Sequence, residues 1–350
     1  MVIMSKASRR RATTAETCGG RGDRVDRRTA LGLLAGAAGL AGAGLAGCTP
    51  RDASARPSGP AHTPVIPGDT DGPPTRATTG TARVRVPYGR DDSQYADLHL
   101  PAGTRRRGTV VIIHGGFWRA TYTAELGTPL AADLARRDFV AWNLEYRRVG
   151  DGGGWPETFS DVAAGVDALA EVARRGDHGR IDTSSVVAVG HSAGGQLAAW
   201  LAGRAYPPTG FTGAGTRPAD ARVTISGVVS QAGVLDLAVA ARSGIGGTAV
   251  PDLLGGTAAM VPGRYRGVDP IRRLPLGVPV HCVHSKTDAT VPYSQSTAYV
   301  NAAVRAGDQA FLHPVQGNHL TLIDPTSAAW ATVIALLPDL LGSDPAHPGR

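Results

Sequence analysis

A serine framed by glycines is the first feature of this sequence that could perform chemistry. Gly190-His191-Ser192-Ala193-Gly194 has the spacing G-x-S-x-G and follows an apolar run at 186–189. A strand, a tight turn and a helix in that order lift a serine hydroxyl above a sheet, and the strained turn requires small neighbours. The turn also aims the Ala193 amide at the place where negative charge develops during acyl transfer. The pattern predicts a nucleophile at Ser192, and the alternative is a serine that only caps a helix.

A serine nucleophile needs a histidine as base, and the base needs an acid that orients it. Chains with this serine motif carry the three groups in the order serine, acid, histidine. Asp288 and His319 each follow a strand predicted late in the chain, at the edge where an open parallel sheet gathers its active site. We therefore predict Asp288 as the acid and His319 as the base. Asp236 and Asp324 are the rival acids.

A second glycine-rich turn follows the predicted strand at 109–113. It reads His114-Gly115-Gly116-Phe117-Trp118, and its glycines allow the backbone to present amides without obstruction by side chains. The amides of Gly115, Gly116 and Phe117 would complete an oxyanion hole with that of Ala193. The alternative is a plain turn after a strand. Trp118 beside this loop and His191 inside the serine motif are the candidates for lining the substrate pocket.

Other reactive side chains in the sequence are better explained by structure than by catalysis. His281 and His284 flank Cys282 in a predicted strand, and their spacing places them on opposite faces, which excludes a shared metal ion. Cys282 is predicted to be a buried core thiol. Glu145 and Arg147 at a strand end are predicted to hold neighbouring loops through an ion pair.

The elements that must position these residues alternate regularly between strand and helix. Strands are expected at 83–88, 95–100, 109–113, 139–145, 185–189, 223–229, 278–284 and 310–315, and helices at 124–137, 159–175, 193–202, 294–306 and 326–341. This alternation predicts an α/β fold with a doubly wound, mostly parallel sheet and helices on both faces. The glycine-rich stretch 235–274 breaks the rhythm and is predicted to be a small insertion over the site.

The motifs together resemble the α/β-hydrolase superfamily. More narrowly, they resemble its esterase branch with an HGG-aromatic-Trp loop, shared by kynurenine-formamidase-like hydrolases and related carboxylesterases. The carriers are 114–118, 145–147, Trp155-Pro156 with Asp161, 190–195, Asp288 with Val291-Pro292, and 317–319. The resemblance implies a serine hydrolase that forms an acyl-enzyme and needs no metal or organic cofactor. Phe117 replaces the third glycine of the lipase-type loop, which shifts the likeness toward formamidases, and Ser285 stands where the superfamily often has glycine.

Charge is concentrated at the N-terminus. The chain of 350 residues has a net charge of +7, of which residues 1–47 carry +5 and the remainder only +2. A basic face for nucleic acid is therefore not expected on the folded part. A chain with 42% apolar and 19% charged residues also has the balance of a globular protein, which excludes disorder throughout.

The N-terminal segment has the pattern of an export signal. An arginine-rich stretch precedes residues 29–47, which carry no charge and consist of alanine, glycine, leucine and one threonine. Leu45-Ala46-Gly47-Cys48 resembles a bacterial lipobox, so Cys48 is predicted to be lipidated, and the pair Arg27-Arg28 resembles a twin-arginine signal. An ordinary cleavage site, with secretion, and an uncleaved anchor are the alternatives.

These observations give one expected organisation. Residues 1–47 form the signal, 48–82 a tether rich in Pro, Thr and Ser that begins at the lipidated cysteine, 83–342 the catalytic domain and 343–350 a flexible tail. We expect an exported, membrane-anchored serine hydrolase acting on small carboxylic esters. The alternatives are an aryl-formamidase or small amide hydrolase, and a non-catalytic surface lipoprotein that only binds a ligand.

Overall fold

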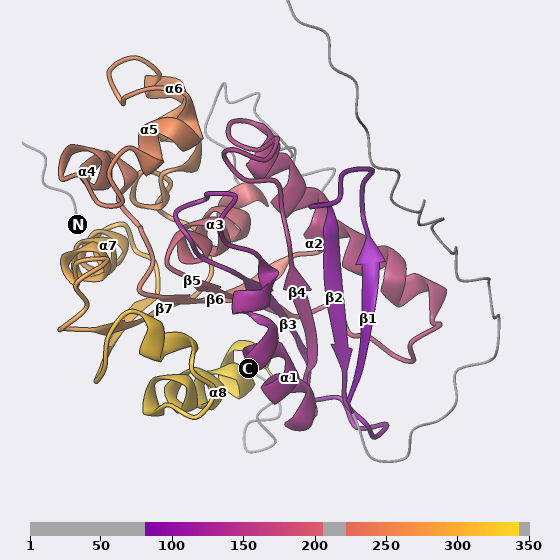
Figure 1. Cartoon of the computed structure of the whole chain (residues 1–350). Coiled ribbons are helices and arrows are strands. Elements are labelled where there is room, and N and C mark those ends of the chain that lie inside the picture. Colours follow the sequence, from indigo (N-terminus) through magenta and orange to yellow (C-terminus); the bar gives the residue numbers. More distant parts are fainter. Residues whose placement is uncertain (1–80, 206–221, 343–350) are drawn as a thin grey trace, which may run out of the picture. The chain divides into compact units, whose positions relative to one another are not determined.

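The computed structural model describes residues 81–205 and 222–342 (Figure 1). The predicted signal, the predicted lipidation site at Cys48, nearly all of the predicted tether and the predicted tail lie outside the described residues. The described residues form an eight-stranded sheet in the order β1-β2-β4-β3-β5-β6-β7-β8. Its strands are β1 (Ala82–Pro87), β2 (Tyr95–Leu100), β3 (Thr109–Ile113), β4 (Val140–Leu144), β5 (Val186–His191), β6 (Ile225–Gln231), β7 (Val280–Ser285) and β8 (Ala310–Val315). Strand β2 pairs antiparallel with both β1 and β4, and β3 to β8 are parallel.

Helices cover both faces of the sheet, so the predicted doubly wound α/β architecture is confirmed. The long helices are α1 (Thr128–Arg136), α2 (Glu157–Arg175), α3 (Ala193–Ala202), α7 (Ser294–Arg305) and α8 (Ala328–Leu340). Short 3-10 turns are η1 (Ala124–Leu126), η2 (Gly203–Ala205) and η5 (Leu320–Ile323). In the described ranges, no helix combines the length and the hydropathy needed to cross a membrane.

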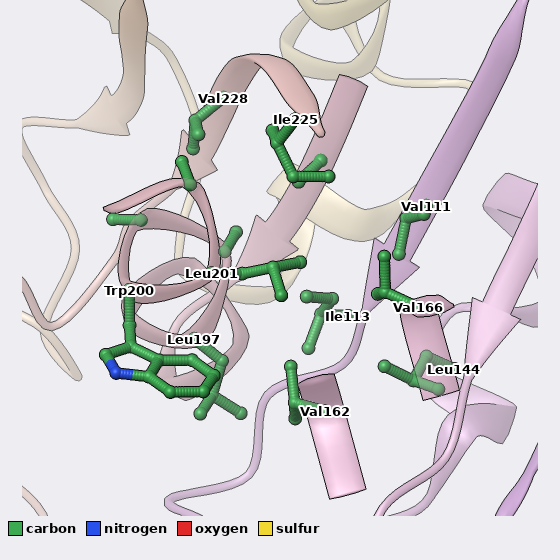
Figure 2. Close-up of a cluster of buried hydrophobic side chains, with 14 of the residues drawn as sticks. Val111, Ile113, Leu144, Val162, Val166, Leu197, Trp200, Leu201, Ile225 and Val228 are labelled. Atoms are coloured by element: carbon green, nitrogen blue, oxygen red, sulfur yellow. The ribbon is translucent and has the colours of Figure 1, made fainter. Parts of the chain in front are cut away.

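The continuous apolar strands explain this arrangement, because alternate side chains of a buried strand must find cover on opposite faces. In β3, Val111 and Ile113 pack in one core with side chains of α2 and α3 (Figure 2). Tyr299 and Ala303 of α7 belong to the same core. Val110 and Ile112 pack in the other core, against α1 and α8. Burial therefore holds the central strands in place from both faces. Their carboxyl ends form one rigid edge of the sheet, and the site lies at that edge.

The predicted insertion at 235–274 is a group of short helices, α4 (Leu237–Arg242), α5 (Ala249–Leu254), α6 (Pro262–Val268) and the turn η4 (Pro270–Arg272). It contacts the loop after β3, where Arg119 donates to the carbonyl oxygen of Gly246 at 3.2 Å. Asp236, one of the rival acids, begins α4 by accepting a hydrogen bond from the amide of Val239 at 2.8 Å. It thus has a capping role.

Most element boundaries differ from the expectation by one or two residues, and two of the differences have a local cause. The helix expected at 124–137 is divided into η1 and α1 at Gly127, where Pro129 opens the new helix. Proline is favoured in the first turn of a helix because it has no amide hydrogen, and an amide hydrogen in that turn has no acceptor within the helix. Strand β5 continues to His191 rather than ending at Val189, because it keeps its ladder with β6 up to Gln231.

Candidate active site

Ser192 stands at the turn between β5 and α3 with φ 56° and ψ −118°, a strained conformation for a residue with a side chain. The neighbouring glycines are required by packing. A Cβ on Gly190 would overlap the backbone of Gly194, and a Cβ on Gly194 would overlap the carbonyl of Ile113. Ala193 is the first residue of α3, so its amide has no acceptor within the helix and remains available to a ligand. These are the features expected of the predicted nucleophile turn.

His319 and Asp288 are brought together by the loops that follow β8 and β7. The Nδ1 of His319 lies 2.7 Å from Oδ2 of Asp288, both largely buried. Because the carboxylate accepts, Nδ1 carries the hydrogen and leaves Nε2 free to take a proton. The second rival acid, Asp324, accepts hydrogen bonds from Thr326 at an exposed turn instead.

The loop of Asp288 is held by polar contacts on several sides. Its Oδ1 accepts the amides of Thr290 and Val291 at 2.8 and 2.9 Å. Burial opposes the charge on this carboxyl, but hydrogen bonds from His284, His319 and the Val291 amide outweigh burial and hold its pKa well below the usual range. Ser285, at the position where the superfamily often has glycine, donates from Oγ to the carbonyl of Gly317 at 2.5 Å and so ties the acid loop to the histidine loop.

A small hollow of about 220 Å³ joins these groups. It is lined by Gly116, Phe117, Tyr122, Leu126, His191, Ser192, Thr290, His319 and Leu320. Ser192 and His319 therefore face the same space, and His191 lines it as well. None of the residues of the insertion lines this hollow, but Gly246 of the insertion packs against the ring of Phe117, which does.

Trp118 does not line the hollow, contrary to the prediction. Its side chain is fully buried, and its Nε1 donates to Gln196 at 3.1 Å. The reason is local, because Phe117 and Trp118 both have positive φ, 53° and 56°. This backbone conformation directs Phe117 toward the hollow and Trp118 into the core. The alternation of side chains along an extended strand does not predict these directions.

The loop predicted to supply the oxyanion hole lies against the serine turn. A Cβ added to Gly115 would be 2.9 Å from the Cβ of Ser192, closer than ordinary packing allows. Gly116 has φ +106°, and a Cβ there would overlap the ring of Tyr122. The loop thus approaches Ser192 on the side where β3 lies beside β5, and Gly116 and Phe117 line the same hollow as Ser192.

A network of buried charged side chains lies next to this loop, and the sequence predicted only part of it. Glu145 pairs with Arg148 at 2.5 Å and accepts hydrogen bonds from His114 Nε2 and the Ala124 amide. Arg147 instead pairs with Asp161 at 2.7 Å, so the predicted Glu145 and Arg147 ion pair is wrong in its partners. Burial opposes the charge of Glu145, but these donors outweigh burial and keep its pKa lowered.

His191 links the serine turn to the histidine loop. Its Nε2 donates to the backbone carbonyl of His319 at 3.0 Å, and the two rings lie 4.4 Å apart. Burial and the nearby His319 lower the pKa of His191 to about 3, so the ring is neutral at ordinary pH. A neutral imidazole here can hold His319 without repelling the positive charge that His319 would gain.

The histidines and the cysteine of β7 occupy the places expected of them. His281 bonds to His313 at 2.9 Å, whereas His284 faces the acid loop. Cys282 is buried, and burial raises the pKa of its thiol to about 12. Within residues 81–205 and 222–342, no group of three or more His, Cys, Asp or Glu side chains could hold a metal ion.

Comparison with known proteins identifies the family of this chain and agrees with its fold. The family described as BD-FAE matches residues 96–302, more than half of the chain. No curated protein matches the sequence significantly.

Solved structures with the same fold include several esterases. A truncated carbohydrate esterase from gut microbiota superposes with a TM-score of 0.64 at 21% identity, covering 78% of this chain and 100% of that one. Esterase B of Lactobacillus rhamnosis gives 0.61 at 19% identity over 75% and 86% of the two chains. A thermophilic esterase of the planctomycete Thermogutta terrifontis gives 0.57 at 21% identity over 77% and 93%.

Proposed function

This chain belongs to the BD-FAE family of α/β-hydrolase-like esterases, and we propose that it is an exported serine hydrolase that cleaves small carboxylic esters. In this proposal Ser192 is the nucleophile, His319 the base and Asp288 the acid. The observation that carries it is the 2.7 Å hydrogen bond from His319 to Asp288 at the rim of a hollow that also contains the strained Ser192. A serine that only capped α3 would need neither partner, and its side chain makes no capping hydrogen bond.

The proposed reaction proceeds through an acyl-enzyme. Nε2 of His319 takes the proton of Ser192 as Oγ attacks the carbonyl carbon, and Asp288 stabilises the resulting imidazolium. The carbonyl oxygen gains negative charge and is bound by amides of Ala193 and of residues 115–117. His319 then gives the proton to the leaving alcohol. Water, deprotonated by His319, releases the acid and restores Ser192.

The volume of the hollow favours ester substrates with a short acyl group. Pockets that enclose drug-sized molecules occupy roughly 300–1,000 Å³, and the hollow here holds about 220 Å³. At its mouth Leu320 is 63% and Tyr122 42% exposed. An ester can therefore place a small acyl group inside while its alcohol part extends over these two side chains.

The test is hydrolysis by the full chain of a short-chain aryl ester, with N-formylkynurenine in a parallel assay. Ser192→Ala is the inactive variant, and Ser243→Ala at an exposed helix end is the matched control. We expect ester cleavage that Ser192→Ala abolishes and Ser243→Ala retains. A fluorophosphonate should label Ser192 and no other serine.

Two outcomes would replace the proposal. Much faster cleavage of the formamide would favour an aryl-formamidase or small amide hydrolase, the alternative supported by the loop His114–Trp118. A folded chain whose Ser192 reacts with neither substrate nor fluorophosphonate would be a binding module that keeps the fold. Hydrolysis that survives Ser192→Ala would refute the assignment of the nucleophile.

The proposed location is the outer side of the cell membrane. Its support is the uncharged segment 29–47 and the lipobox-like residues that end at Cys48. Mass spectrometry of the membrane fraction should find a mature chain that begins with a lipid-modified Cys48. An unmodified N-terminus, or cleavage elsewhere, would contradict lipidation. The double substitution Arg27→Lys with Arg28→Lys keeps the charge of the arginine pair and should block export if the twin-arginine route is used.

A further inference from the structure

A second histidine reaches the carboxylate of Asp288. His284, near the end of β7, is fully buried, and its Nε2 lies 3.4 Å from Oδ2 of Asp288, the same oxygen that receives His319. The same nitrogen is 3.0 Å from the carbonyl oxygen of Val291, in the loop that carries the acid. The N–H of His284 is thus shared between the acid and its loop.

The hydrogen-bond partners fix which nitrogen carries the hydrogen. The Val291 carbonyl can only accept, so Nε2 of His284 must donate. Nδ1 then accepts, and Oγ of Ser296 in the first turn of α7 lies 2.8 Å from it. The ring is therefore held between α7 and the acid loop with its donor toward Asp288.

We propose that His284 is a positioning residue, which acts on the base only through Asp288 by holding this carboxylate and drawing part of its charge away from His319. The inference rests on the proposed function. Without the His284 donor, the carboxylate would present more of its charge to His319, and the protonated imidazole would be stabilised. His319 would then stay protonated, and inactive as a base, up to a higher pH.

The other titratable groups around Asp288 do not account for such a shift. They are His191 at the end of β5, Cys282 on β7, Tyr293 before α7 and the exposed Lys286 in the acid loop. Burial lowers the pKa of His191 to about 3 and raises that of Cys282 to about 12, and burial also raises the pKa of Tyr293. His191, Cys282 and Tyr293 therefore do not change charge near neutral pH.

The experiment is the pH profile of kcat/KM for ester hydrolysis by the full chain. In His284→Phe, we expect the acidic limb to move up by about 0.5–1 pH unit, a roughly three- to tenfold loss of kcat/KM at a pH on that limb. His284→Gln keeps an N–H donor and should restore most of the wild-type profile. His281→Phe is the matched control, because His281 lies on the same strand but faces His313, and its profile should be unchanged.

A folded, active His284→Phe with an unmoved acidic limb would overturn the inference while leaving the proposed function intact. Should that variant not fold, Ser296→Ala removes the partner that fixes the ring, and a smaller shift in the same direction is expected. No shift in Ser296→Ala would then count equally against the inference. A wild-type chain without Ser192-dependent hydrolysis overturns the proposed function and this inference together.

Discussion

The substitution Gly115→Ala tests whether the loop after β3 supplies oxyanion donors. The added Cβ would lie 2.7 Å from the carbonyl oxygen of His191 and 2.9 Å from the Cβ of Ser192. Carbon needs about 3.4 Å or more for ordinary contact, so the loop must retreat from the serine by about 0.5–0.7 Å. Oxyanion donors act at about 2.7–3.1 Å, a window narrower than this displacement.

The expected consequence is a loss of transition-state stabilisation with little effect on binding. Removal of one oxyanion donor typically lowers kcat by about 10²–10³, and we expect kcat of Gly115→Ala to fall into that range with KM nearly unchanged. Steady-state hydrolysis of a short-chain aryl ester measures both constants. Gly103→Ala is the control, because the nearest atom to its new Cβ is 4.0 Å away. If Gly115→Ala is folded and its kcat is within threefold of wild type, the loop does not provide the donors.

Three further predictions concern the groups around this loop and the sheet. Glu145→Gln removes one of the two carboxylates that pair with the buried Arg148, which keeps Asp151, so the free energy of unfolding should fall by about 2 kcal/mol and kcat should fall with it. Denaturation and kinetics measure the two effects, and an unchanged unfolding midpoint would contradict the network. His191→Phe loses the donor to the His319 carbonyl, and kcat should drop about tenfold at constant KM, whereas equal kcat would refute a positioning role. Asp97 is buried, which opposes its charge, but Arg85 and Arg83 outweigh burial and lower its pKa. The ionised carboxylate therefore stabilises the fold above about pH 4, and this contribution is lost as the pH falls below that value. In Asp97→Asn, the free energy of unfolding measured by denaturant titration should therefore decrease less between neutral and acidic pH than in the wild type.

Much of the architecture could be predicted because burial leaves a direct trace in the residues. The run Thr109–Ile113 is β-branched throughout and is buried on both faces, and the structure makes it the central strand β3. Ser192 was predicted from the spacing G-x-S-x-G, and Asp288 and His319 from the order serine, acid, histidine together with the rule that ligands bind beyond the carboxyl ends of parallel strands. That rule depends only on strand direction and order, which the alternation of strand and helix already indicates.

Side-chain partners could not be predicted in the same way, because beyond a strand end the alternation of faces no longer holds. Phe117 and Trp118 adopt positive φ, and the second ring turns into the core. Arg147 finds Asp161 on α2, a contact set by how the helix packs. The spacing of His281 and His284 correctly separated their faces, yet nothing in the sequence places His284 beside Asp288.

The strand order gives the site its two sides. Strand β5 carries Ser192 and lies between β3, which leads to the loop 114–118, and the group β6, β7 and β8, of which the last two lead to Asp288 and His319. In the proposed reaction, the substrate carbonyl would therefore meet the amides from one side and the imidazole from the other, with the serine between them. The two sides of the site are held by different contacts. A charged network around Glu145 holds the first side, and a hydrogen-bonded network around His284 holds the second, so a substitution can disturb one side without the other. Damage to the first should lower kcat at every pH, whereas damage to the second should appear mainly as a displaced acidic limb.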